Sequence, residues 1–327
     1  MLMNFSSVAF DTGSSDILIP SKACTTSQGC EPKGAKFNSA KSSTFSATNR
    51  PWQTRFGTGV GVGVGSAATP FCAGNQALDT VTVAGLAVKG QTIGIINRQS
   101  PNLFEGTGIE GIFGMGFSGG STLRTAPYFQ NLINQKKINQ PIFSMYMTPK
   151  AVGDAELTLG GTNPSKYSGD INYVPVNSRS GSWTIRFASI TVNGKSTSIK
   201  GQTAIADSGT SNMIAPARDA AAIYSLISRN ITLLDPKGAY GIPCSMIKDL
   251  NATITFSIGG KPYTIPSREL SVGPFPGRQG ICQTLINSGP MGRWIIGASL
   301  MKYYYTVWDV GNSRMGWATT NHSPNVH

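Results

Sequence analysis

Hydrophobic positions along the chain fall mainly in short runs rich in Val, Ile, Thr, Phe and Tyr, bounded by Gly, Pro, Asn or Ser. Runs of this kind predict β-strands. The clearest ones cover residues 7–10, 157–159, 171–176, 188–192, 252–258 and 303–308. The 39 Gly and 19 Pro, spread along the sequence, favour many turns between these short strands.

Two segments have helical spacing instead. Residues 128–138 place Phe129, Leu132 and Ile133 on one face, and residues 217–228 repeat Ala, Ile and Leu after Pro216. Proline is favourable in the first turn of a helix. The sequence therefore predicts an all-β fold class, mostly strands with a few short helices.

One internal repeat organises the chain. The sequence D-T-G-S-S at 11–15 follows an apolar run, and D-S-G-T-S at 207–211 follows another. Each is followed by two apolar residues and Gly, at 112–114 and at 295–297. One D-T-G-S-S is equally well explained as a turn, but two copies in matching context indicate a duplicated lobe with pseudo-two-fold symmetry. We expect lobes at 1–172 and 173–327, with Asp11 in the first and Asp207 in the second.

Histidine usage excludes several hydrolase classes. The only two histidines, His322 and His327, lie in a polar C-terminal tail. A Ser-His-Asp or Cys-His site needs an imidazole held in the core, and a zinc hydrolase usually needs at least two. The G-x-S-x-G match at 116–120 has no histidine to serve it, and the G-x-G-x-x-G match at 114–119 lacks the acidic residue expected further on. We interpret the first match as a turn, give the second no weight, and expect no metal and no cofactor.

Carboxylate chemistry remains. Two carboxyls brought together, Asp11 and Asp207, do not both ionise easily, so one keeps its proton and the pair titrates as a unit. The ionised member takes a proton from water while the protonated member hydrogen-bonds to the scissile carbonyl, giving a tetrahedral diol without a covalent intermediate.

The residues beside each acid suit this task. A glycine lets the backbone turn beneath the acid, one hydroxyl is placed to lock the two loops together, and another is placed to donate to the outer carboxylate oxygen. In that order, these residues are Gly13 and Gly209, Thr12 and Ser208, and Ser14 and Thr210.

With these motifs the chain resembles the pepsin-like aspartic proteases over nearly its whole length. Further matching segments are 42–45, 56–59, 159–161, 173–176, 294–297 and 304–309. The resemblance implies a bilobal double-barrel fold with a central cleft, and an endopeptidase that is made as an inactive precursor and cuts between hydrophobic residues at acid pH. It places a flap at Phe56, Gly57 and Thr58. It also implies substrate pockets lined by Leu103, Phe104, Ile109 and Ile112.

The chain departs from that family at several places. The family usually has Tyr at the position of Phe56 and Trp at that of Leu18, which hydrogen-bond to each other; here we expect an apolar contact. Alternating Val and Gly at 60–65 lead into an expected insertion at 66–77. Asp11 is preceded by fewer residues than in the family, so we expect an N-terminal portion to be missing.

Cysteines and sequons favour the secretory pathway. Cys24 with Cys30 and Cys244 with Cys282 are spaced to close loops, and both pairs match disulfides of the family. Cys72 is then either a buried thiol or the partner of something outside the chain. Sequons occur at Asn4, Asn230, Asn251 and Asn321. No signal peptide is recognisable and no apolar stretch predicts a membrane span. We expect a secreted glycoprotein or one in an acidic vacuolar compartment.

The net charge of +12 allows a nucleic-acid partner in principle, but Lys and Arg are scattered and form no run longer than Lys136-Lys137. We expect a monomer that acts on peptides or proteins and not on nucleic acid. Two alternatives remain: a pepsin-like binding or inhibitor protein without activity, and a basic carbohydrate- or surface-binding protein. The two intact acid motifs favour catalysis, and the altered flap is the main feature against it.

Overall fold

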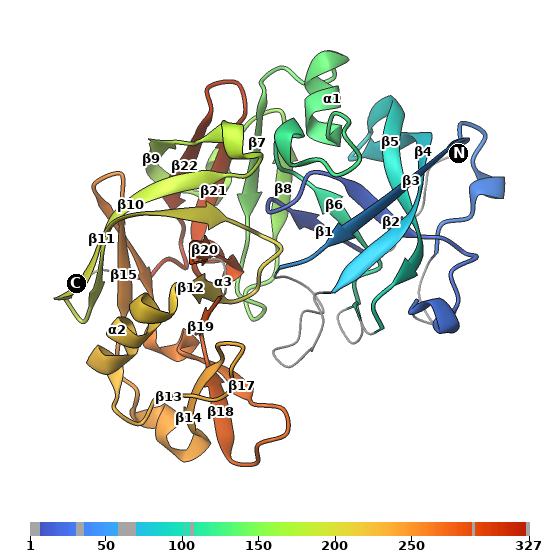
Figure 1. Ribbon diagram of the computed structural model, residues 1–327. Coiled ribbons are helices and arrows are strands. Elements are labelled where there is room, and N and C mark those ends of the chain that lie inside the picture. Colours follow the sequence, from blue (N-terminus) through green and yellow to red (C-terminus); the bar gives the residue numbers. More distant parts are fainter. Residues whose placement is uncertain are drawn as a thin grey trace. The chain divides into compact units, whose positions relative to one another are not determined.

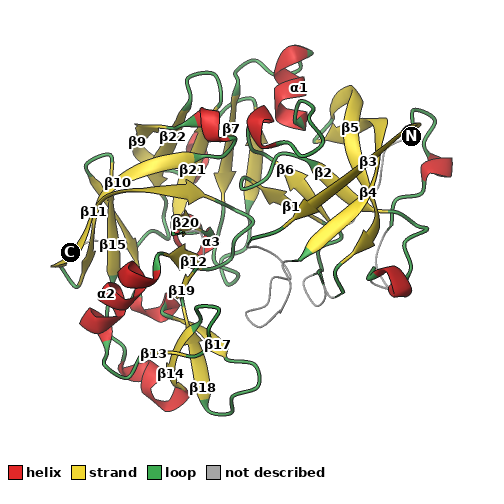
Figure 2. Cartoon of the chain, in the orientation of Figure 1, coloured by secondary structure: helices red, strands yellow, loops and turns green. Residues whose placement is uncertain are grey.

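The computed structural model describes residues 7–30, 36–57, 70–101, 103–104, 108–289 and 292–324. These residues form many strands and a few short helices (Figures 1 and 2), which confirms the predicted all-β class. None of the helices in these ranges is both long and apolar enough to cross a membrane.

The chain divides into two compact units. Unit 1 comprises Met1–Pro141 and Ser178–Trp183, and unit 2 comprises Ile142–Asn177 and Thr184–His327. Residues 142–172 thus belong to unit 2, because strands of that segment pair with strands near the C-terminus. The lobes predicted at 1–172 and 173–327 differ from these units over that segment and stay a prediction.

Unit 1 is built on a six-stranded sheet in the order β1-β6-β2-β5-β4-β3. Its strands are β1 (Val8–Asp11), β2 (Ile17–Pro20), β3 (Ser46–Arg55), β4 (Phe71–Val83), β5 (Leu86–Gln99) and β6 (Gly111–Gly114), and its helix is α1 (Tyr128–Asn134). The strand β1 runs parallel to β6, with Asp11 opposite Gly114. This pairing brings the first acid motif beside its apolar-apolar-Gly segment.

Unit 2 contains three sheets, of seven, five and four strands. The seven-stranded sheet has the order β16-β15-β10-β11-β20-β12-β19, the five-stranded sheet β8-β7-β21-β22-β9 and the four-stranded sheet β13-β14-β18-β17. The strands are β7 (Ile142–Tyr146), β8 (Glu156–Leu159), β9 (Ser168–Pro175), β10 (Thr184–Val192), β11 (Lys195–Ala206), β12 (Met213–Ala215), β13 (Thr232–Leu233), β14 (Tyr240–Pro243), β15 (Ile254–Ile258), β16 (Lys261–Ile265), β17 (Ser271–Pro274), β18 (Ile281–Thr284), β19 (Ile286–Ser288), β20 (Trp294–Ile296), β21 (Tyr304–Asp309) and β22 (Arg314–Thr319). The helices are α2 (Ala217–Ile227) and α3 (Ala298–Met301).

The expected duplication is visible in the strand order of the two units. In unit 1, β1 is parallel to β6, β6 is antiparallel to β2, and β2 is parallel to β5. In unit 2, β11 is parallel to β20, β20 is antiparallel to β12, and β12 is parallel to β19. Each acid motif therefore lies within the same arrangement of four strands.

Most predicted elements correspond to observed ones, with two differences in the helices. The helix predicted at 128–138 ends at Asn134, and Lys136 has a φ of 54°, outside the helical region. The short helix α3 was not predicted. Of the expected insertion at 66–77, residues 71–77 lie in β4 and pair with β3 and β5, and residues 66–69 lie outside the described ranges. That this segment is an insertion relative to the family stays a prediction.

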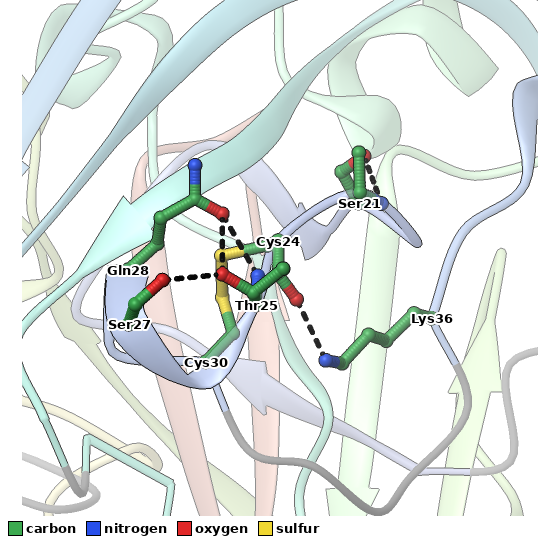
Figure 3. The surroundings of a disulfide bond; sticks show 8 residues. Ser21, Cys24, Thr25, Ser27, Gln28, Cys30 and Lys36 are labelled. Carbon is green, nitrogen blue, oxygen red and sulfur yellow. Dashed lines mark hydrogen bonds between the residues drawn. A yellow bond between two sulfur atoms is a disulfide. The ribbon is translucent and has the colours of Figure 1, made fainter.

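Both expected disulfides are present, Cys24–Cys30 in unit 1 and Cys244–Cys282 in unit 2. The first closes a short turn, and the Lys36 ammonium donates to the Cys24 carbonyl oxygen across 2.8 Å (Figure 3). Cys72 is a free, buried thiol. Burial and, secondarily, the negative charge of Asp16 raise its pKa far above the usual range, so the thiol stays protonated.

A buried carboxylate at the end of β21 makes folding stability depend on pH. Burial alone would raise the pKa of Asp309, but hydrogen bonds from Asn312 and Arg314 outweigh it and lower the pKa. Because the folded pKa is depressed, this stabilisation is complete above the unfolded pKa of about 3.9 and is lost as pH falls through the folded pKa.

Asp309→Asn should therefore lower the free energy of unfolding by about 1.5–3 kcal/mol near pH 6, and by progressively less below pH 4. Denaturant unfolding across this pH range measures the difference. The matched control is Asp154→Asn, since Asp154 is 91% exposed and only 3.9 Å from Lys166; it should change little. An equal loss at every pH would contradict the linkage.

Candidate active site

The first acid lies at the end of β1, where the chain turns sharply. The Gly13 backbone N–H donates to Asp11 Oδ1 at 2.9 Å, and the Ser14 hydroxyl donates to Asp11 Oδ2. The Met115 N–H donates to the Asp11 carbonyl oxygen at 2.8 Å, which fixes the loop to the residue after β6. Both carboxylate oxygens therefore have donors from the loop itself.

The second acid repeats this pattern after β11. The Gly209 N–H donates to Asp207 Oδ1 at 2.8 Å, and the Thr210 hydroxyl donates to Asp207 Oδ2 at 2.6 Å. The Asp207 N–H donates to the Ile296 carbonyl oxygen at 2.9 Å, so the loop is anchored to β20. The Ser14 and Thr210 hydroxyls thus each donate to the Oδ2 atom of the acid three residues earlier. That these atoms are the outer oxygens of a carboxyl pair stays a prediction.

The glycine of each apolar-apolar-Gly segment lies directly against an acid loop. A Cβ on Gly114 would be 2.3 Å from the Asp16 nitrogen and 2.3 Å from the Ser15 carbonyl carbon. A Cβ on Gly297 would be 1.9 Å from the Asn212 oxygen and 2.3 Å from the Thr210 oxygen. Both positions accept only glycine, because the crowding atoms belong to the backbone.

Thr12 and Ser208 were expected to lock the two acid loops to each other. Thr12 is fully buried and Ser208 is half-buried. The two residues belong to different compact units, so their mutual contact stays a prediction, as does the pairing of Asp11 with Asp207.

Sequence reasoning missed Asp16, which ends the first acid loop. Its buried carboxylate accepts hydrogen bonds from the Ser121 hydroxyl (2.6 Å), from the Thr122 N–H and hydroxyl (both 2.7 Å) and from the Leu123 N–H (3.3 Å). These bonds tie the turn at 121–123 to the loop. The corresponding residue of the second copy is Asn212. An acid in place of an amide, directly after D-T-G-S-S, was the available signal.

The expected pocket residues are mostly enclosed. Leu103, Phe104 and Ile112 are only 1%, 5% and 6% exposed and belong to one hydrophobic cluster. Phe56 and Ile109 are partly buried and pack against that cluster. Gly57 is exposed, and Thr58 lies outside the described residues. The structure therefore brings these side chains together in unit 1, with Phe56 and Ile109 at the accessible side.

The alternative hydrolytic motifs have no support in the described geometry. Ser118 is exposed in a single 3-10 turn, as expected for a turn. The ring nitrogens of His322 lie near the Lys302 carbonyl, Asn321 and the Tyr146 hydroxyl. The described ranges contain no cluster of three or more His, Cys, Asp or Glu side chains arranged to hold a metal ion.

Comparison with known proteins agrees with this geometry. The sequence pattern of the family described as "Eukaryotic aspartyl protease" matches residues 4–320. The chain belongs to this family. It is 32% identical to embryonic pepsinogen of Gallus gallus, over 95% of this chain and 76% of that protein, and 32% identical to cathepsin D of Clupea harengus, over the same shares. It is 30% identical to an aspartic protease of Phaffia rhodozyma, over 96% and 73%.

Family membership confirms the resemblance seen in the motifs and the class of enzyme, an aspartic endopeptidase that acts on peptides or proteins. It also agrees with the all-β architecture of both units. The relatives named above are called proteases or a protease precursor, and none is called an inhibitor or a binding protein.

Proposed function

We propose that Asp11 and Asp207 together form the catalytic pair of this aspartic endopeptidase. The observation that carries the proposal is the identical support of the two carboxylates: a glycine N–H on Oδ1 and a hydroxyl on Oδ2, each at the end of a strand parallel to an apolar-apolar-Gly strand. One acid ionised and one protonated can activate water and polarise the peptide carbonyl, respectively.

The loop donors have a defined part in this chemistry. Gly13, Ser14, Gly209 and Thr210 donate to each acid from its own loop. The inner faces of the two carboxyls are then available to share a proton and a water molecule. Each donor favours the ionised form of its acid, whereas repulsion between two negative charges keeps one proton on the pair. The singly protonated pair is the active form, and it loses its remaining proton as pH rises. Activity should therefore peak at acid pH and fade before neutrality.

Substrate and location follow from the family and from the residues. The apolar cluster around Leu103 and Phe104, with Phe56 and Ile109 at its accessible side, suits hydrophobic side chains flanking the cut. Relatives named pepsinogen and cathepsin D, together with two disulfides, support passage through the secretory pathway to the outside or to an acidic compartment. A precursor form, a monomeric state and the lack of a nucleic-acid partner remain parts of this proposal.

The deciding experiment is incubation of the purified protein with an unfolded protein at acid pH, with and without a statine-type inhibitor. Fragments that appear at acid pH and disappear with the inhibitor are expected. Binding of the unfolded protein without fragments would favour the non-catalytic alternative and would contradict the proposal.

Thr210→Ala should move the alkaline limb of the kcat/KM profile upward. The hydroxyl donates to a charged acceptor, a bond worth about 1.5–3 kcal/mol. Losing the donor disfavours the ionised acid, so the pair keeps its last proton to higher pH. Thr255→Ala is the control, because among the described residues that hydroxyl bonds to Thr264 and not to either acid. A limb that stays put or moves down would refute the assigned role.

A further inference from the structure

Trp52 is the largest buried side chain of the cluster that holds the expected pocket residues, and neither the acid motifs nor the flap motif includes it. It lies in β3, four residues before Phe56, and is 6% exposed. The Phe56 N–H donates to the Pro70 carbonyl at 2.8 Å, so the extended pairing continues to that residue. Side chains alternate along a strand, which puts Trp52 and Phe56 on the same side.

Two glycines make room for the indole. Trp52 stands opposite Gly74 of β4, which has no side chain on that face. On β5, a Cβ at Gly94 would lie 2.8 Å from the Trp52 Cε2 and Cζ2 atoms and 2.7 Å from Leu18 Cδ2. The indole therefore reaches from β3 across β4 to β5, where it meets Leu18 of β2. Leu18 in turn follows the first acid loop by two residues.

Hydrogen bonding does not account for a tryptophan here. The indole N–H is buried and has no acceptor within the described part of the chain. A buried donor without a partner destabilises the folded chain, and a phenylalanine would avoid that cost. What tryptophan adds at this position is size: it fills space in the cluster that also holds Leu103, Phe104 and Ile112, and against which Phe56 packs.

From this arrangement we propose that Trp52 is a specificity-determining residue that forms the floor of the apolar substrate pocket and limits the size of the side chain it accepts. The proposal rests on the proposed proteolytic function. It predicts a preference for compact aliphatic residues such as leucine over tryptophan next to the cut. Leu103, Phe104 and Ile112 are buried in the same cluster as the indole, and Phe56 and Ile109 are its partly accessible neighbours, so a substrate side chain would meet the cluster at these two residues.

Two substitutions should move the preference in opposite directions. Trp52→Leu removes most of the floor and should raise the ratio of kcat/KM for a tryptophan peptide over a leucine peptide about tenfold or more, since each methylene accommodated is worth about 1–3 kcal/mol. Gly94→Ala keeps every native side chain but forces the indole and Leu18 away from β5, because the crowding atoms belong to movable side chains. It should lower the same ratio.

The experiment uses two peptides that differ only in one residue, placed in turn on each side of the cut, with the full chain and both variants. Trp317→Leu is the matched control, since Trp317 is likewise fully buried with no acceptor for its indole N–H among the described residues, but lies in β22 of unit 2. It should leave the ratio unchanged.

An unchanged ratio in Gly94→Ala and Trp52→Leu, or an equal change in Trp317→Leu, would overturn the proposal while cleavage itself upholds the proposed function. If Trp52→Leu does not fold, the proposal stands or falls on Gly94→Ala. If the wild-type chain cleaves neither peptide, the proposed function is wrong and the role of Trp52 falls with it.

Discussion

Asp11→Asn and Asp207→Asn should each reduce kcat for peptide hydrolysis by a factor of about 10²–10⁴ or more, because each acid supplies one half of the proton transfer. Asparagine has the shape of aspartate but neither ionises nor carries an acidic proton. The loops should survive the change: Gly13 and Gly209 can still donate to Oδ1, and the hydroxyls of Ser14 and Thr210 can turn to accept from the new amide.

Steady-state cleavage of an unfolded protein measures the loss, and thermal unfolding checks that the fold is kept. Asp235→Asn is the matched control, since Asp235 accepts from the Lys237 and Ala239 N–H groups at 3.0 Å in a turn of unit 2. That variant should remain fully active. Substantial activity in either Asp11→Asn or Asp207→Asn would remove that residue from the mechanism.

The acid loops were predictable from sequence because the donors to each carboxylate are local. The donors to Asp11 lie two and three residues away, and the same spacing recurs at Asp207. The apolar-apolar-Gly segments are distant in sequence, but the repeat showed which belonged to which acid. Parallel pairing of Asp11 with Gly114 then followed the expected order.

Features that are set by contacts between distant strands could be predicted less well from the sequence. The start of β4 reads F-C-A-G-N-Q-A, without clear alternation of apolar and polar residues, so the sequence does not indicate where this strand begins. Pairing with β3 on one side and β5 on the other makes it a strand. Likewise, the place of Trp52 depends on Gly74 and Gly94 of two other strands, and no motif around residue 52 indicates it.

The position of each acid loop also depends on the close approach of its backbone to Gly114 or Gly297. Gly114→Ala and Gly297→Ala should each reduce kcat/KM about 10²-fold or more. A new Cβ would overlap backbone atoms of the neighbouring acid loop, at 2.3 Å for Gly114 and at 1.9 Å for Gly297. Backbone cannot rotate away as a side chain can, so the loop must shift, and a misplacement of about 1 Å can cost 10²-fold in rate.

Stability should fall in the same variants by about 1–3 kcal/mol, the usual cost of overpacking a well-packed site. Gly119→Ala separates this effect from the general cost of replacing a glycine. Its Cβ would lie 3.5 Å from the nearest atom, Gly181 Cα, which is ordinary van der Waals contact. Cleavage assays and denaturant unfolding on all three variants give both quantities. If Gly114→Ala and Gly297→Ala instead behave like Gly119→Ala, the acid loops tolerate displacement. Close backbone approach is then not the reason why both segments have glycine at this position.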